Sequence, residues 1–84
     1  MFETLNITAA RSRGLRILAA RHPASVYRSN QSSDKSGYPG SVYWQSADWL
    51  VDNGFAEWTY GARDGALRLT KAGETYCRQV GFLR

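Results

Sequence analysis

The residues of this chain that could do chemistry are mostly arginines, accompanied by Gln45, three tryptophans and a few carboxylates. Eleven lysine and arginine residues against seven aspartate and glutamate residues give the 84 residues a net charge of +4. Guanidinium groups neutralise phosphates, and the amide of Gln45 could read an adenine edge, so this set favours a nucleic-acid partner. The charge is uneven, because residues 36–60 contain three carboxylates and neither lysine nor arginine.

Catalytic and metal chemistry have little support in the sequence. The single cysteine, Cys77, and the single histidine, His22, cannot complete a metal site, and one cysteine cannot form an intramolecular disulfide. We expect Cys77 to be a small core residue and His22, next to Pro23, to lie at a helix end. No glycine-rich phosphate loop precedes a helix, and no carboxylate pair lies near an acid–base partner. We therefore predict no catalytic residue, no metal and no cofactor.

The apolar stretches of the chain are short. None has the length that spans a bilayer, and residues 1–14 contain no apolar segment of signal-peptide length. We therefore expect a cytoplasmic protein that does not contact membranes. A hydrophobic content of 43% with 13% aromatic residues predicts one small folded domain over residues 1–84.

The first predicted helix runs from about Thr8 to Arg21. Apolar residues recur there at helical spacing, and Asn6 or Thr8 would be the N-cap. The helix should end before Pro23, because the residue that precedes a proline is driven out of the helical conformation.

The connection that follows is polar. Residues 24–27 are compatible with either a helical turn or a short strand. Residues 28–40 are rich in serine and glycine, which predicts a mobile loop.

A second helix is predicted from Ser41, as N-cap, to about Asn53. Gly54 should end it in a left-handed conformation, with Phe55 packing back on the helix. At helical spacing, one face carries the apolar side chains and the other the polar ones. The apolar face comprises Tyr43, Ala47, Leu50 and Val51 with Trp44 at its border, and the other comprises Gln45, Asp48, Trp49 and Asp52.

A β-hairpin is predicted next. Residues 55–60 and 66–70 alternate in polarity, and residues 61–65 form a turn with glycine at both ends. In the second strand Leu67 and Leu69 share one face, and Arg68 lies on the other.

A third helix should follow the hairpin. Thr70 is a suitable N-cap, and the helix runs from Lys71 to about Val80. The side chains expected to face inward are Ala72, Tyr76, Cys77 and Val80.

This order of elements resembles the winged helix-turn-helix superfamily. The segments that carry the resemblance, "LVDNGFAEW" and "RDGALRLTKAG", are similar to the MarR- and PadR-type pattern, and the match covers residues 41–79 well and 8–21 less closely. The resemblance implies an α+β fold, with about three helices and a two-stranded β-hairpin wing. The matching residues are Leu50, Gly54, Phe55, Asp64, Leu69, Thr70 and Gly73.

The resemblance also implies a function. The second helix would lie in the major groove of double-stranded DNA, and the wing would contact the backbone or the minor groove. The chain would be a small stand-alone DNA-binding protein, a transcriptional regulator or recombination accessory factor of a phage or mobile element, either monomeric or a homodimer. The implied DNA-contacting residues are Val42, Trp44 and Gln45, with Asp48 and Trp49 as further candidates, and Arg63, Arg68 and Lys71 of the wing. Arg13 and Arg16, on the solvent side of the first helix, would add phosphate contacts.

Two features depart from the family pattern. Nineteen residues, 22–40, replace a short helix and tight turn, and the second helix carries Asp48 and Asp52 but no lysine or arginine. Phosphates would repel these carboxylates. In an alternative interpretation the scaffold binds a protein, as an inhibitor or adaptor, with Trp49 between the two aspartates as anchor. Trp49→Ala would then abolish partner capture and leave the fold intact.

Overall fold

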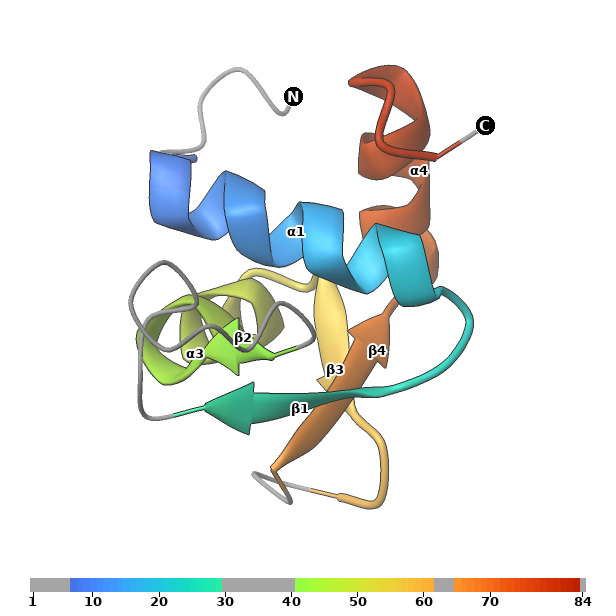
Figure 1. Ribbon diagram of the computed structural model, residues 1–84. Helices are drawn as coiled ribbons and strands as arrows, with labels where there is room; N and C mark the ends of the chain where they lie inside the picture. The colour runs from blue at the N-terminus through green and yellow to red at the C-terminus, as the bar shows by residue number, and fades with distance from the viewer. Residues whose placement is uncertain (1–6, 30–40, 62–64, 84) are drawn as a thin grey trace.

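Three helices pack on a four-stranded sheet in the part of the chain that the computed structural model describes, which is residues 7–29, 41–61 and 65–83 (Figure 1). The expected α+β class is thereby confirmed. The elements, in chain order, are α1 (Ala9–Arg21), β1 (Val26–Ser29), β2 (Val42–Tyr43), α3 (Trp44–Asp52), β3 (Ala56–Trp58), β4 (Ala66–Leu69) and α4 (Lys71–Gln79).

Helix α1 begins and ends close to the predicted residues. The Thr8 hydroxyl accepts a hydrogen bond from the backbone N–H of Arg11 at 3.3 Å, which confirms Thr8 as N-cap; Asn6 lies outside the described residues. Leu15 and Leu18 are fully buried on the face that packs against α3 and the sheet.

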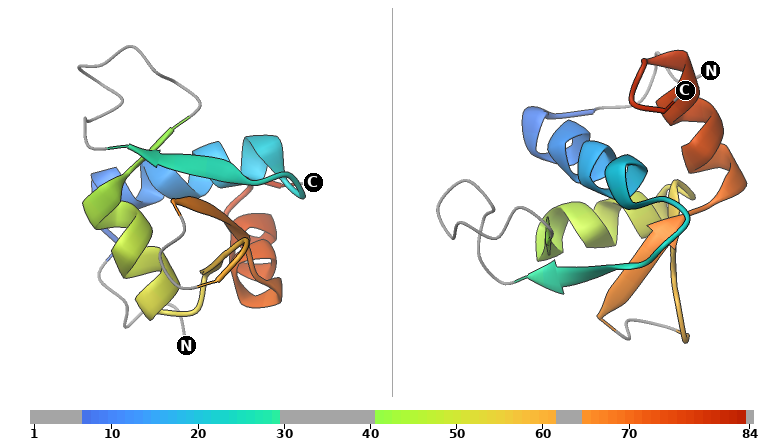
Figure 2. Two further views of the ribbon diagram at one scale, coloured as in Figure 1. Left: turned by 90° about the horizontal axis from the view of Figure 1, so that it is seen from below. Right: turned by 45° about the vertical axis from the view of Figure 1, so that its right-hand side comes forward.

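The sheet has the strand order β2-β1-β4-β3. In the β3–β4 hairpin Ala56 lies opposite Leu69 and Glu57 opposite Arg68, while β1 pairs antiparallel with β4 and parallel with β2. The hairpin is therefore not an isolated two-stranded projection, because β1 supplies hydrogen-bonding partners along the second edge of β4. Its far end still extends away from α1 and α4 (Figures 1 and 2).

Strand β1 corrects the prediction for the connection after α1. Of the two structures allowed for residues 24–27, the strand is the one that forms, from Val26. It also continues through Arg28 and Ser29, which the predicted loop included. The remainder of that loop, residues 30–40, lies outside the described residues.

Helix α3 starts at Trp44 and not near Ser41 as predicted. Val42 and Tyr43 are instead extended in β2, where they pair with Arg28 and Ser29 of β1. Tyr43 takes the N-cap position without a side-chain capping bond. An extended backbone that pairs with a neighbouring strand cannot also be helical, so strand pairing overrides the capping signal.

The end of α3 is as predicted. Gly54 has a φ of +82°, and its N–H donates to the carbonyl of Val51 at 3.1 Å, while the N–H of Phe55 donates to the carbonyl of Leu50 at 2.9 Å. These two bonds define a Schellman motif. Phe55 is consequently turned back into the core, where it is 1% exposed.

Helix α4 joins the base of the hairpin. The Thr70 hydroxyl accepts a hydrogen bond from the N–H of Gly73 at 3.1 Å and donates one to the carbonyl of Gly54. Gly73 lies so close to β3 that an added methyl group would overlap the carbonyl oxygen of Phe55.

This close approach changes the buried face of α4. The buried residues are Gly73 and Cys77, whereas Ala72 is exposed and Val80 is 45% exposed. The prediction that Ala72 and Val80 face inward is therefore wrong. Helix α4 packs along the glycine because only that residue lets the backbones approach.

Candidate nucleic-acid interface

The solvent-facing side of α3 carries Gln45, Asp48 and Asp52, which we call the α3 ridge. Gln45 and Asp52 are exposed, and the side chain of Asp48 is 19% exposed. Trp44, at the start of the helix, is 36% exposed. Trp44 and Gln45 are thus accessible to a ligand. Val42 is fully buried in β2, so the expectation that it faces a DNA groove is wrong.

Arg28 of β1 meets the α3 ridge from one side. Its Nη1 atom lies 3.9 Å from Oδ1 of Asp48, and its guanidinium carbon lies 5.8 Å from the centre of the Trp58 ring. Side chains alternate along a strand, so Arg28 is on the same face as the buried Val26, the face that α3 covers. The guanidinium offsets the negative charge that Asp48 contributes to α3.

Arg11 of α1 meets α3 from the other side. Its guanidinium carbon lies 4.3 Å from the centre of the Trp49 ring, and Trp49 stacks on Phe55 with ring centroids 6.0 Å apart and planes 28° apart. Trp49 is therefore half-buried between a cation and the core. It does not protrude in the way that the protein-anchor interpretation expects.

The two arginines lie on different sides of the α3 ridge. Asp48 and Trp49 are consecutive in the helix and so point about 100° apart. A small pocket of about 150 Å³ lies on the Arg11 flank, between α1 and the start of α3. Arg11 and Gln45 both line it. A helix without basic residues of its own is thus bordered by two guanidinium groups from other elements.

The hairpin contributes an aromatic side chain on the same side. Trp58 lies opposite the buried Leu67, and the ladder continues with the N–H of Thr59 donating to the carbonyl of Ala66 at 2.9 Å. Strand β3 ends at Trp58, and Tyr60, two residues later, is 87% exposed.

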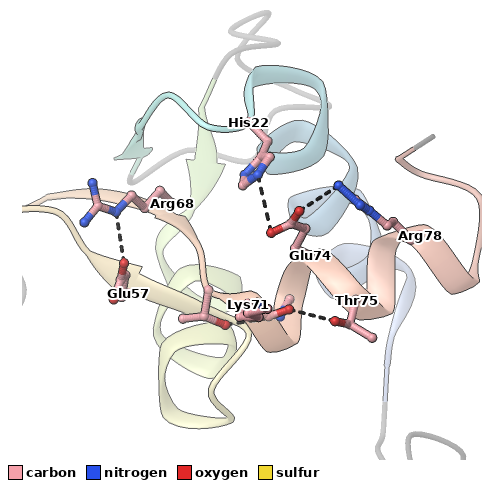
Figure 3. A network of polar contacts seen from close by, with 9 residues as sticks. His22, Glu57, Arg68, Lys71, Glu74, Thr75 and Arg78 are labelled. Carbon is pink, nitrogen blue, oxygen red and sulfur yellow. Dashed lines mark hydrogen bonds and ion pairs between the residues drawn. The ribbon is translucent and has the colours of Figure 1, made fainter.

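Other predicted hairpin contacts lie elsewhere. Arg63 is outside the described residues. Arg68 is on the opposite face of the sheet from Trp58, where its Nε atom lies 3.0 Å from Oε2 of Glu57 (Figure 3). Lys71 is exposed at the start of α4. The structure therefore does not bring Arg68 to the α3 ridge.

Arg13 and Arg16 also lie apart from the α3 ridge. They belong to the side of α1 that is turned away from the buried Leu15 and Leu18. A groove of about 590 Å³ runs there between α1 and the chain that follows α4, and we call it the α1–α4 groove. Its lining residues are Arg13, Arg16, Ile17, Ala20, Arg21, Val80, Gly81 and Phe82.

His22 links α1 to α4. As expected it lies at a helix end, where it is the C-cap of α1, and its Nε2 atom is 3.8 Å from Oε1 of Glu74. Glu74 also accepts a 2.7 Å hydrogen bond from Arg78 (Figure 3). These contacts are structural and engage none of the α3 ridge.

The described residues form neither an accessible thiol nor a cluster of metal-binding side chains. Cys77 is fully buried, as predicted, and burial raises the pKa of its thiol from 9.0 to about 11, so it stays protonated at neutral pH. Within residues 7–29, 41–61 and 65–83, no three histidine, cysteine or acidic side chains gather where a metal ion could bind. No helix in those ranges combines the length and the apolar run needed to cross a bilayer.

The sequence analysis missed Arg11 and Arg28 as members of this surface. The alternation of Val26, Tyr27 and Arg28 contains a signal for the second of these, because a strand there puts Arg28 on the core-facing side. No local signal identifies Arg11, since its contact with Trp49 depends on how α1 packs on α3. Comparisons with models of known families, with curated proteins and with solved structures found no match to the chain.

Proposed function

We propose that this domain is a winged helix-turn-helix module that binds double-stranded DNA through α3 and the β3–β4 hairpin. The observation that carries the proposal is the position of Arg11 and Arg28 on the two flanks of the α3 ridge. A helix in the major groove has a phosphate backbone on either side, and flanking guanidinium groups would neutralise both.

The order of the elements supports the same assignment. The hairpin follows α3 directly through the turn at Gly54, and β1 pairs with β4 as a third antiparallel strand beside it. The pairing of β1 with β4 extends to the turn end of the hairpin, where the N–H of Arg28 donates to the carbonyl of Gly65 at 2.6 Å. This end of the hairpin would contact a backbone or a minor groove while α3 occupies the major groove. Tyr60, exposed after the end of β3, would contact the sugar–phosphate backbone.

Base contacts are assigned to the first turn of α3. Gln45 is exposed there, and a side-chain amide can pair with the N6 and N7 atoms of adenine. Trp44, also exposed, would pack against a thymine methyl group. Because few side chains would contact bases directly, most of the affinity would come from phosphate contacts. Binding would therefore be only modestly specific for sequence. The biological role that fits such a module is transcriptional regulation or assistance to recombination.

The protein-binding alternative has weaker support. It relied on Trp49 as an exposed anchor, and this side chain is held between Arg11 and Phe55. Its flanking carboxylate Asp48 lies beside Arg28. The expected acidic patch around an exposed tryptophan is therefore not what surrounds α3, where carboxylates and guanidinium groups lie side by side.

The test is a fluorescence anisotropy titration of a labelled random-sequence DNA duplex at two salt concentrations. We expect Arg11→Gln/Arg28→Gln to weaken binding by about tenfold or more. The slope of log affinity against log salt should fall by about 0.9 for each phosphate contact that is lost.

The matched control is Arg13→Gln/Arg16→Gln, which removes the same charge from the other side of α1. It should cause a small loss and leave the slope nearly unchanged, and circular dichroism verifies that both variants fold. Equal losses from the two pairs would refute the assignment to α3, and an affinity independent of salt would refute DNA binding.

A further inference from the structure

The α1–α4 groove is separate from the surface assigned to DNA. Residues Arg13, Ile17 and Ala20 recur at helical spacing on the face of α1 that is turned away from α3. The hairpin's far end points away from this side of the molecule (Figures 1 and 2). A ligand in the groove would therefore not compete with a DNA helix bound at α3.

The second wall of the groove is made by a turn after α4. Gly81 has a φ of +89°, which reverses the chain, and the N–H of Phe82 donates to the carbonyl of Cys77 at 2.7 Å. The turn brings the Phe82 ring to α1, where the Arg16 guanidinium carbon lies 5.2 Å from the ring centre. Val80, 45% exposed, lies beside it along the same wall.

The groove combines positive charge with apolar surface. Helix α1 contains four arginines and no acidic residue, and three of these arginines line the groove. None of the described residues that line it is acidic. The other side chains of the lining, from Ile17, Ala20, Val80 and Phe82, are apolar. A matching ligand therefore has carboxylates and apolar groups side by side.

The exposure of the lining distinguishes between possible ligands. Arg16, Ala20, Arg21, Val80 and Gly81 are all exposed, so the site is an open groove along a helix and not an enclosed cavity. A small molecule would be largely uncovered there, whereas most binding pockets bury their ligand. A phosphate backbone would gain nothing from the apolar wall. The observations favour a peptide segment.

We propose that the α1–α4 groove docks an acidic amphipathic segment of a partner protein. Carboxylates of the segment pair with Arg16 and Arg21, and an apolar side chain packs on Ile17, Val80 and Phe82. Charge complementarity sets the orientation, and the apolar contact supplies the desolvated centre that such interfaces need. This surface would let the domain recruit a second protein while α3 remains free for DNA.

The experiment titrates the full chain into a fluorescein-labelled peptide in which glutamate and leucine recur at helical spacing. Two matched peptides replace every glutamate by glutamine, or every leucine by serine. We expect only the first peptide to bind, with an affinity that falls as salt is added. Amide chemical shifts of Ala20 and Gly81 should change on binding, which requires no substitution in the protein.

Variants locate the site. Arg16→Gln/Arg21→Gln should weaken peptide binding by about tenfold, the loss expected for two charge pairs at a partly exposed interface. Val80→Ser, which alters an exposed side chain, should also weaken it, whereas Arg11→Gln/Arg28→Gln should have no effect.

Three results would overturn the proposal: no binding of the acidic peptide, equal binding of either control peptide, or displacement of the peptide by duplex DNA. The last result would identify the groove as a nucleic-acid contact. A failure of DNA binding at α3 would leave the peptide result unaffected, so the two proposals can fail independently.

Discussion

The α3 ridge and the α1–α4 groove are both bordered by arginines, but the arginines have different neighbours. At the ridge, Arg28 lies beside Asp48 and Arg11 covers Trp49, so each guanidinium meets a side chain of α3. In the groove, the Arg16 guanidinium lies over the Phe82 ring, and Arg13 and Arg21 are further lining residues beside the apolar wall. The same residue type therefore contacts α3 on one surface and lines an apolar wall on the other.

The two surfaces also differ in how they are assembled. The cations at the ridge come from α1 and β1, and the carboxylate that one of them offsets comes from α3. The arginines among the described residues of the groove all come from α1. The relative positions of arginines from several segments depend on packing, whereas those on one helix face depend mainly on local spacing. Substitutions that disturb packing should consequently displace the arginines of the ridge relative to one another more than those of the groove, unless they unfold the domain.

The largest effect on stability is expected at Gly73, where α4 packs closely against Phe55, the residue that precedes β3. Gly73→Ala would force apart α4 and β3, because the new methyl group overlaps the carbonyl oxygen of Phe55. We expect a loss of about 3 kcal/mol in the free energy of unfolding, and a melting temperature lower by about 10–20 °C. Thermal denaturation followed by circular dichroism measures it. The exposed neighbour change Ala72→Ser is the control, and a melting temperature equal to that of the control would contradict the close packing.

A smaller effect on the free energy of unfolding is expected for the two tryptophans of α3, and it should differ between them. Trp49→Ala removes a side chain stacked on Phe55 and should lower the free energy of unfolding by about 2 kcal/mol. Trp44→Ala changes a more exposed ring and should cost less than about 1 kcal/mol. Urea unfolding followed by circular dichroism compares them. An unchanged stability for Trp49→Ala would instead support the interpretation of Trp49 as a protein-binding anchor.

The smallest effect is expected on the outer face of the sheet, which belongs to neither surface. Arg68 and Glu57 form an ion pair at 3.0 Å with about half of each side chain exposed, so their coupling should be below about 0.5 kcal/mol. A double-mutant cycle of Arg68→Ala and Glu57→Ala measures this coupling. Arg68→Ala should also change DNA affinity little. A tenfold loss of affinity would mean that DNA contacts the outer face of the hairpin.

Much of the local structure could be predicted because the signals lie within a few residues. Thr8 and Thr70 cap their helices through their own hydroxyl groups, and Gly54 ends α3 with a positive φ. These devices act between residues three to five positions apart, so context rarely changes them. The start of α3 was mispredicted because Val42 is held by a strand that pairs with β1.

The candidate site was less predictable than the elements that carry it. Gln45 and Trp44 were identified from helical spacing, and both are accessible. Their neighbours Arg11 and Arg28 are 34 and 17 positions away from Gln45 in the sequence. Periodicity along one element carries no information about which side chains of another element will lie across from it.

The sequence by itself determined the class of the domain, the caps of α1 and α4, the stop after α3, the hairpin and an arginine-rich face on α1. Each of these follows from hydrogen bonds or side-chain spacing within one segment. Tertiary structure decided that β1 would extend the hairpin, that Gly73 would set the buried face of α4, and that Arg11 and Arg28 would border an acidic helix. Those outcomes depend on the packing of distant segments, where close approach and unpaired strand edges outweigh local preference.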